Sequence, residues 1–237
     1  MGALNITQLV KERSFYSEFQ PLWDTVSENI FAFEAFIRTA PRMNPVTIFE
    51  NARKKGVLYE FDTASISNAI KEFPYVYLNK YYLFVNVFPS TIVHHDFPIF
   101  IEGLLNVYPD IKHRIVFEIN EAAIEENYWD QEIFLSRLAF LKSSGFRVAF
   151  DDIPVCKTSL QKIMQLAPDF IKLDPSHSEQ LTDSLEKQQN IKFLLNFVHA
   201  KTDLVLEGIE TKDDLLTAKK LGVTIMQGYY ISKPQRL

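Results

Sequence analysis

The sequence is short of cysteine, of glycine and of long apolar runs, and each shortage narrows what the protein can be. The single cysteine, Cys156, excludes an internal disulfide and fits a reducing compartment, so we expect a cytoplasmic protein. Seven glycines leave no glycine-rich nucleotide loop. The apolar stretch 81–93 is interrupted by Asn86 and Pro89, so we expect no membrane span and no membrane partner.

Positive charge is also in deficit. The chain has 25 Lys and Arg against 30 Asp and Glu, which gives a net charge of −5. Such a chain repels nucleic acid polymers, so we expect none as a partner, and a phosphate compound would need a local cation as a bridge. Hydrophobic residues make up 47% of the 237 residues, enough for a sizeable core, and we expect residues 1–237 to form one domain.

Apolar strand-like runs alternate with amphipathic helix-like segments along most of the chain. This alternation predicts parallel strands, and eight strands in this length suggest an α/β fold of the TIM (β/α)8 barrel type. The link 25–29 between the first two strands is too short for a crossover helix, so the first strand should be antiparallel to the second. We expect strands at residues 19–24, 30–38, 82–88, 113–120, 146–152, 170–174, 203–209 and 224–231.

Most of these strands carry a polar residue in their later half, where a buried strand should be apolar. One such residue is usually a solvated residue at the rim, but recurrence on most strands is hard to explain by chance. In a TIM barrel this end of the strands carries the active site, so the polar side chains should converge there. The candidates are Glu34, Arg38, Asn86, Glu118, Asp151, Asp152, Lys172, Glu207 and Gln227.

Carboxylates dominate this set, which predicts a site for hard divalent cations. Like charges buried together raise each other's pKa unless a cation neutralises them, and oxygen ligands favour Mg²⁺ or Mn²⁺ over zinc. Two metals that share one carboxylate would suit phosphodiester hydrolysis, and the adjacent Asp151 and Asp152 suit such a bridge. Lys172 could orient the attacking water or offset negative charge, and Arg38 could bind a phosphate oxygen.

With these motifs in order, the sequence resembles the EAL-domain family of cyclic-di-GMP phosphodiesterases over nearly its whole length. Each motif alone is weak, but their order and spacing together are specific. The matches are Gln20 and Pro21 in "FQPL", Glu34 and Arg38 in "EAFIR", Asn86, Glu118 and Glu121 in "EINE", Asp151 and Asp152, Lys172 and Asp174 in "KLD", Glu207 to Thr211 in "EGIET", and Gln227 with Gly228.

The resemblance implies a modified TIM barrel that hydrolyses cyclic-di-GMP to linear pGpG with Mg²⁺ or Mn²⁺ in a two-metal site. It implies that Lys172 and Gln227 place the attacking water, while Glu207 is either a metal ligand or the general base. The implied ligands are Glu34, Asn86, Glu118 and Asp151 for the first metal, with Asp151 bridging to the second beside Asp152. The implied substrate-binding residues are Arg38 and Gln20, and Glu121 would anchor the loop after the aspartate pair.

That loop departs from the family. Where the family continues its aspartates with F-G-x-G-Y-S, residues 153–158 are "IPVCKT", which lack both glycines and contain Pro154. Proline and β-branched residues do not easily adopt the backbone angles that glycine allows, so the support of the metal site is altered. We therefore expect a phosphodiesterase of weak activity. Alternatives are a cyclic-di-GMP sensor with little turnover, or a protein-interaction regulator, although the complete ligand set disfavours the latter. A homodimer and a regulatory protein partner are further expectations.

Overall fold

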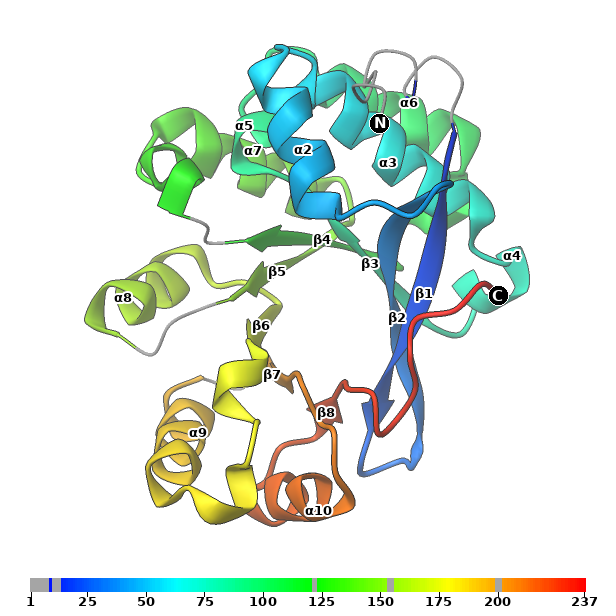
Figure 1. The fold of residues 1–237 in the computed structure, drawn as a ribbon. Helices are drawn as coiled ribbons and strands as arrows, with labels where there is room; N and C mark the ends of the chain where they lie inside the picture. Colours follow the sequence, from blue (N-terminus) through cyan, green and yellow to red (C-terminus); the bar gives the residue numbers. More distant parts are fainter. Residues whose placement is uncertain (1–8, 10–13, 121–122, 153–155, 199–201) are drawn as a thin grey trace.

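Eight strands close into a barrel in the order β1 to β8 (Figure 1). The computed structural model describes residue 9 and residues 14–120, 123–152, 156–198 and 202–237. β1 pairs antiparallel with both β2 and β8, and all other neighbouring strands are parallel. The modified TIM barrel with an antiparallel first strand is therefore confirmed. The strands are β1 Phe15–Asp24, β2 Asn29–Thr39, β3 Tyr82–Asn86, β4 Ile115–Asn120, β5 Arg147–Asp151, β6 Phe170–Leu173, β7 Asp203–Leu206 and β8 Ile225–Met226.

The eighth strand is much shorter than expected, because the chain turns immediately after it. A Cβ at Gly228 would lie 2.1 Å from the backbone oxygen of Ile209, so only glycine fits this close approach. The turn is held by the backbone N–H of Tyr230, which donates to the Ile209 oxygen at 3.0 Å. The predicted strand 224–231 therefore ends at Met226.

Helices connect the parallel strands and cover the outside of the barrel (Figure 1). Gly145 and Gly222 follow α7 and α10 with φ values of 92° and 100°, as expected of residues that end helices. The helices are α2 Pro45–Lys54, α3 Leu58–Glu72, α4 Tyr75–Leu78, α5 Pro89–Ile92, α6 Phe97–Val107, α7 Glu132–Ser143, α8 Lys157–Leu166, α9 Leu185–Phe197 and α10 Lys212–Leu221. Short 3₁₀ turns are η1 Pro109–Ile111, η2 Ala123–Tyr128, η3 Pro175–His177 and η4 Leu181–Asp183.

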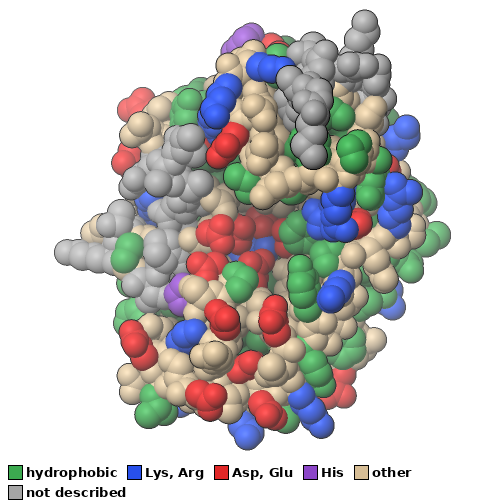
Figure 2. Space-filling view, in the orientation of Figure 1, with side chains coloured by type: hydrophobic (Ala, Val, Ile, Leu, Met, Phe, Trp, Pro, Cys, Tyr) green, Lys and Arg blue, Asp and Glu red, His purple; other side chains and the backbone are tan. Residues whose placement is uncertain are grey.

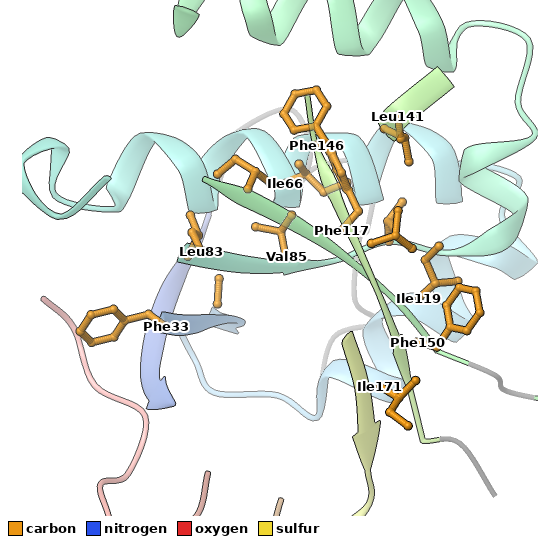
Figure 3. Packing of buried hydrophobic residues seen from close by; sticks show 14 of the residues in the cluster. Phe33, Ile66, Leu83, Val85, Phe117, Ile119, Leu141, Phe146, Phe150 and Ile171 are labelled. Atoms are coloured by element: carbon orange, nitrogen blue, oxygen red, sulfur yellow. The ribbon is translucent and has the colours of Figure 1, made fainter. Parts of the chain in front are cut away.

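Alternate residues of each strand supply two separate apolar layers. One set, which includes Leu83, Val85 and Phe117, packs in the same cluster as Ile66 and Leu141 of the surrounding helices (Figure 3). The opposite set forms a second cluster, which consists of Leu22, Ala32, Phe84, Val116, Ala149, Phe170, Val205 and Ile225. Because strand side chains alternate, the residue two positions beyond each member of this second set lies on the same face.

None of the helices among the described residues is both long enough and apolar enough to cross a membrane.

Candidate active site

The predicted polar residues follow the inner apolar cluster by two positions on seven strands. Ala32 is followed by Glu34 and Phe84 by Asn86, for example, so the polar layer lies directly above the apolar one at the carboxyl ends of the strands. On the antiparallel β1 the same layer is reached two positions earlier, at Gln20, which pairs with Glu34. The layer consists of Gln20, Glu34, Asn86, Glu118, Asp151, Lys172, Glu207 and Gln227.

Lys172 lies at the centre of the carboxylates of this layer and is fully buried. Its Nζ lies 2.9 Å from Glu34 Oε2, 2.6 Å from Glu118 Oε1 and 2.5 Å from Glu207 Oε1. Asp151 Oδ1 is 3.7 Å away. One ammonium group is therefore shared by four carboxylates from β2, β4, β5 and the end of β7.

The shared ammonium group leaves excess negative charge in a buried space. Burial alone would lower the pKa of Lys172, but Asp151, Glu118, Glu207 and Glu34 raise it well above its ordinary value, so the side chain stays charged. Burial raises the pKa of Glu118 well above its ordinary value, with a further increase from Glu34. Burial also raises the pKa of Glu207 to about 8, although Lys172 opposes this shift. The cluster therefore favours any added cation.

Amide side chains from β1, from the end of β3 and from the residue after β8 lie around the carboxylate cluster. Gln227 Nε2 donates to Glu34 Oε2 at 3.0 Å and to Gln20 Oε1 at 3.3 Å. Gln20 Nε2 in turn donates to the backbone oxygen of Ser232 at 2.9 Å, so Gln20 ties the C-terminal segment to β1. Asn86 Nδ2 donates to Glu34 Oε1 at 3.4 Å. Asn86 and Gln227 thus both donate to the Glu34 carboxylate, and Gln20 is joined to it through Gln227.

Asp152 sits at the edge of the cluster in a strained conformation. Its φ of 55° lies in the left-handed region, which is uncommon for residues other than glycine, and its side chain is exposed. Its Oδ2 accepts a hydrogen bond from Nδ2 of Asn120 at the end of β4. Asn120 therefore helps to hold the second aspartate.

Arg38 lies at the edge of the site and is held by a residue that the sequence analysis did not single out. Its Nε donates to Glu18 Oε2 at 2.7 Å. Glu18 alternates with Gln20 on β1, directly beside the strand of Arg38, and this spacing could have identified it. The guanidinium is thus placed near the cluster without being part of it.

A pocket of about 830 Å³ opens above the cluster, within the range of about 300–1,000 Å³ that ligand pockets occupy. Figure 2 shows a hollow near the centre of this face that is lined by acidic side chains, with basic charge among them. Away from the carboxylates, the pocket wall contains the aromatic side chains of Phe36, Phe49 and Phe88, with Arg53 beside them. The pocket therefore combines an acidic floor with an aromatic wall.

The donor set fits divalent cations. Glu34, Glu118 and Glu207 present carboxylate oxygens within 4.8 Å of one another, and so do Asp151, Asp152 and Glu207. Buried oxygens without a hydrogen-bond partner include Oε2 of Glu118 and Oδ1 of Asp151, which desolvation penalises unless a cation is near. Glu207 belongs to both groups, so it is a candidate for the bridging position beside Asp151.

Two predictions fall outside the described residues. Glu121, the expected anchor of the loop after the aspartates, is one of them. The other is the first half of the loop itself, residues 153–155, which includes Pro154. The loop resumes at Cys156, just before α8.

Comparison with known protein families shows which family this chain belongs to. The model of the EAL domain matches residues 3–234. The chain belongs to the EAL domain family. This EAL domain is 27% identical over 154 residues to the probable cyclic di-GMP phosphodiesterase PdeA of Escherichia coli, an overlap of 65% of this chain and 21% of PdeA. The chain spans less than half the length of such curated relatives.

Solved structures show that this EAL domain has the fold of its family. The EAL domain of FimX from Pseudomonas aeruginosa, bound to c-di-GMP, matches with a TM-score of 0.87 at 21% identity, covering 98% of this chain and 95% of that one. A manganese and cyclic-diGMP complex of BlrP1 from Klebsiella pneumoniae matches with a TM-score of 0.81 at 22% identity, covering 94% and 56%. At these identities the likeness concerns the fold alone.

Proposed function

We propose that this EAL domain is a phosphodiesterase that hydrolyses cyclic-di-GMP to linear pGpG with Mg²⁺ or Mn²⁺. The observation that carries the proposal is the cluster of four carboxylates around Lys172, in which Oε2 of Glu118 and Oδ1 of Asp151 are buried without a hydrogen-bond partner. The names of relatives such as PdeA, and the cyclic dinucleotide bound in FimX, support this choice of substrate.

The proposed metal ligands divide into two groups. Two bound divalent cations would activate a water molecule and neutralise the phosphodiester as negative charge develops. We assign the first cation to Glu34, Asn86, Glu118 and Asp151, which gives it carboxylate and amide oxygens. We assign the second to Asp151 and Asp152 with Glu207, which the structure groups with both aspartates.

The residues around the ligands have distinct proposed roles. Lys172 holds Glu34, Glu118 and Glu207 in one arrangement through short ion pairs, and its ammonium group can also orient the attacking water. Gln227 donates to the same Glu34 and completes the wall on that side. Glu207, whose pKa burial raises to about 8, keeps the general-base role as its alternative.

Of the two residues predicted to bind substrate on the first hairpin, Arg38 is assigned a direct contact and Gln20 a supporting role. Arg38 lines the pocket with its guanidinium held by Glu18, which suits a contact with a phosphate oxygen. Gln20 lines the pocket as well, although both ends of its amide already bond within the protein. Its proposed contribution is therefore to fix Gln227 and the adjoining wall.

A second candidate function is cyclic-di-GMP sensing with little turnover. It is favoured by Asp152, whose left-handed backbone precedes a loop without the family glycines. A strained ligand with altered support can bind a nucleotide complex and still misplace the attacking water. We further propose that residues 1–237 act as one domain, that the protein forms a homodimer and that it binds a regulatory protein.

The proposal is tested by incubating the purified protein with cyclic-di-GMP and Mn²⁺ or Mg²⁺ and separating the products by chromatography. We expect linear pGpG in the presence of either metal and none after chelation. Tight binding of cyclic-di-GMP without product, at high protein concentration, would instead identify a sensor. Absence of both binding and turnover would contradict both functions and leave protein interaction as the remaining hypothesis, for which a pull-down is the next experiment.

A further inference from the structure

A second set of buried charges lies beneath the turn that follows β3, away from the carboxylate cluster. β3 ends at Asn86, and the chain then turns through residues 87–90 into α5. The backbone N–H groups of Phe88 and Ser90 stand at the start of this short helix, where N–H groups have no partner within the helix. Both of them donate to buried carboxylates from other parts of the chain.

The first of these carboxylates is Asp62 of α3, which is 1% exposed. Its Oδ2 accepts a hydrogen bond from the backbone N–H of Phe88 at 3.0 Å. Asp62 shares a helix face with Ile66 and Ile70, both buried, so its carboxylate is directed into the protein and not toward solvent.

The second carboxylate is Glu125 of η2, which is fully buried. Its Oε2 accepts from the backbone N–H of Ser90 at 2.7 Å, and its Oε1 accepts from the Ser90 hydroxyl at 2.9 Å. Glu125 also forms an ion pair with Arg53 of α2. The consecutive helices α2 and α3 and the distant turn η2 therefore converge on the turn after β3.

This turn carries two features of the site. Asn86, at its beginning, directs its amide at Glu34. Phe88 lines the pocket, where its ring lies 5.0 Å from that of Phe49 and 5.4 Å from the guanidinium carbon of Arg53. A change in the path of the turn would move both the amide and the ring.

We propose that Asp62 and Glu125 are positioning residues that hold the turn of residues 87–90, so that Asn86 is presented to the metal site and Phe88 to the pocket. Neither carboxylate lines the pocket, so each acts through the turn and not on the substrate. The inference rests on the proposed function, because Asn86 is a metal ligand only there. Outer partners that orient ligands in this way typically change metal affinity about 10- to 100-fold when removed.

Burying the Asp62 carboxylate lowers the stability of the folded protein. Its presence therefore fits a role in positioning the turn better than a role in stability alone. Burial raises the pKa of Asp62 to about 7, against the opposing effect of the Phe88 N–H. Among the groups that face it, Glu125 raises this pKa further and Arg53 lowers it. An asparagine would accept the same hydrogen bond without a charge, and this provides the test.

The test compares Asp62→Ala, which leaves the Phe88 N–H without an acceptor, with Asp62→Asn, which keeps one. Mn²⁺ binding is measured by calorimetry on the full chain without nucleotide, so that the result does not depend on turnover. We expect Asp62→Ala to weaken Mn²⁺ binding about tenfold. Asp62→Asn should stay within about threefold of the wild type.

A matched control lies on the same helix. Thr63 is also buried, but its hydroxyl donates to the backbone oxygen of Tyr59 within α3 and does not contact the turn. Thr63→Ala should therefore leave Mn²⁺ binding unchanged. Should Asp62→Ala fail to fold, Ser90→Ala removes one hydrogen bond to Glu125 and should weaken Mn²⁺ binding by up to about tenfold, beyond the change in Thr63→Ala.

The outcomes separate this inference from the proposed function. Wild-type Mn²⁺ affinity in folded Asp62→Ala, or in Ser90→Ala if the first variant does not fold, would overturn the positioning role alone. An equal loss in Asp62→Asn and Asp62→Ala would also overturn it, because the negative charge and not the hydrogen bond would then matter. Absence of Mn²⁺ binding by the wild type would overturn the proposed function, and this inference with it.

Discussion

Replacing Lys172 with methionine should destabilise the metal-free protein and make its stability depend on divalent cations. The Lys172 ammonium lies within 2.9 Å of three carboxylates and 3.7 Å of a fourth, with no exposure to solvent. Methionine keeps most of the volume but removes the charge. The four carboxylates then repel one another in a largely buried space where water screens them only weakly.

The size of the effect follows from the burial of the cluster. Removing one partner of a buried ion pair costs about 3–5 kcal/mol, because an uncompensated charge remains. In a domain of this size each kcal/mol shifts Tm by about 2–4 °C, so we expect a fall of roughly 6–20 °C in a buffer with chelator. Protonation of Glu207, whose pKa is already raised to about 8, would bring the loss toward the lower end.

Thermal unfolding followed by circular dichroism, with chelator and with excess Mn²⁺, measures both parts of this prediction. Mn²⁺ should raise the Tm of Lys172→Met more than that of the wild type, because cation binding replaces the missing charge. Lys142→Met is the matched control: Lys142 donates to the backbone oxygens of Leu166 and Ala167, so its loss should give no added response to Mn²⁺.

A double variant isolates the electrostatic cause. Adding Glu118→Gln to Lys172→Met removes one of the repelling charges, so the double variant should recover part of the lost Tm. A fall of less than about 2 °C in Lys172→Met, together with an unchanged response to Mn²⁺, would refute the reasoning, since 3–5 kcal/mol requires more.

Three further predictions concern the ligands, the pH dependence and the loop. Glu34→Ala or Asp151→Ala should abolish Mn²⁺ binding measured by calorimetry, and unchanged binding would contradict the site assignment. Because burial raises the pKa of Asp62 from 3.8 to about 7, the folded state holds a proton that the unfolded state has lost, so stability should fall as pH rises between these values. In urea unfolding, the loss of stability between pH 5 and 8 should be roughly 2–3 kcal/mol smaller in Asp62→Asn than in the wild type, and parallel profiles of the two proteins would disprove the shift. Replacing residues 153–158 with a glycine-containing family loop should raise kcat, whereas a flat kcat would show that the loop is not limiting.

The barrel and the polar layer could be predicted from the sequence because both depend on local alternation. Short apolar runs with a polar residue near the end indicated the strands, and the short link 25–29 indicated the antiparallel pair. The length of β8 could not be predicted in this way. It depends on the close approach of Gly228 to Ile209, which is a contact between segments distant in the sequence.

The sequence analysis also missed the buried charges beneath the turn after β3, although the sequence contained an indication of one of them. Asp62 falls four and eight positions before Ile66 and Ile70, on the buried face of α3, where a carboxylate is unexpected. Glu125 and Arg53 gave no such indication, because their pairing requires η2 and α2 to meet around Ser90. Contacts of this kind come from the tertiary fold and not from local periodicity.

The measurement that tests the central claim most directly is metal-dependent hydrolysis of cyclic-di-GMP by the purified protein, with Glu34→Ala as the inactive control. We expect the wild type to release linear pGpG with Mn²⁺ or Mg²⁺ and to lose this activity with chelator, while the variant forms no product. Failure of the wild type to form pGpG with either metal, at protein concentrations that match the substrate, would contradict the account of the Lys172 cluster as a catalytic centre.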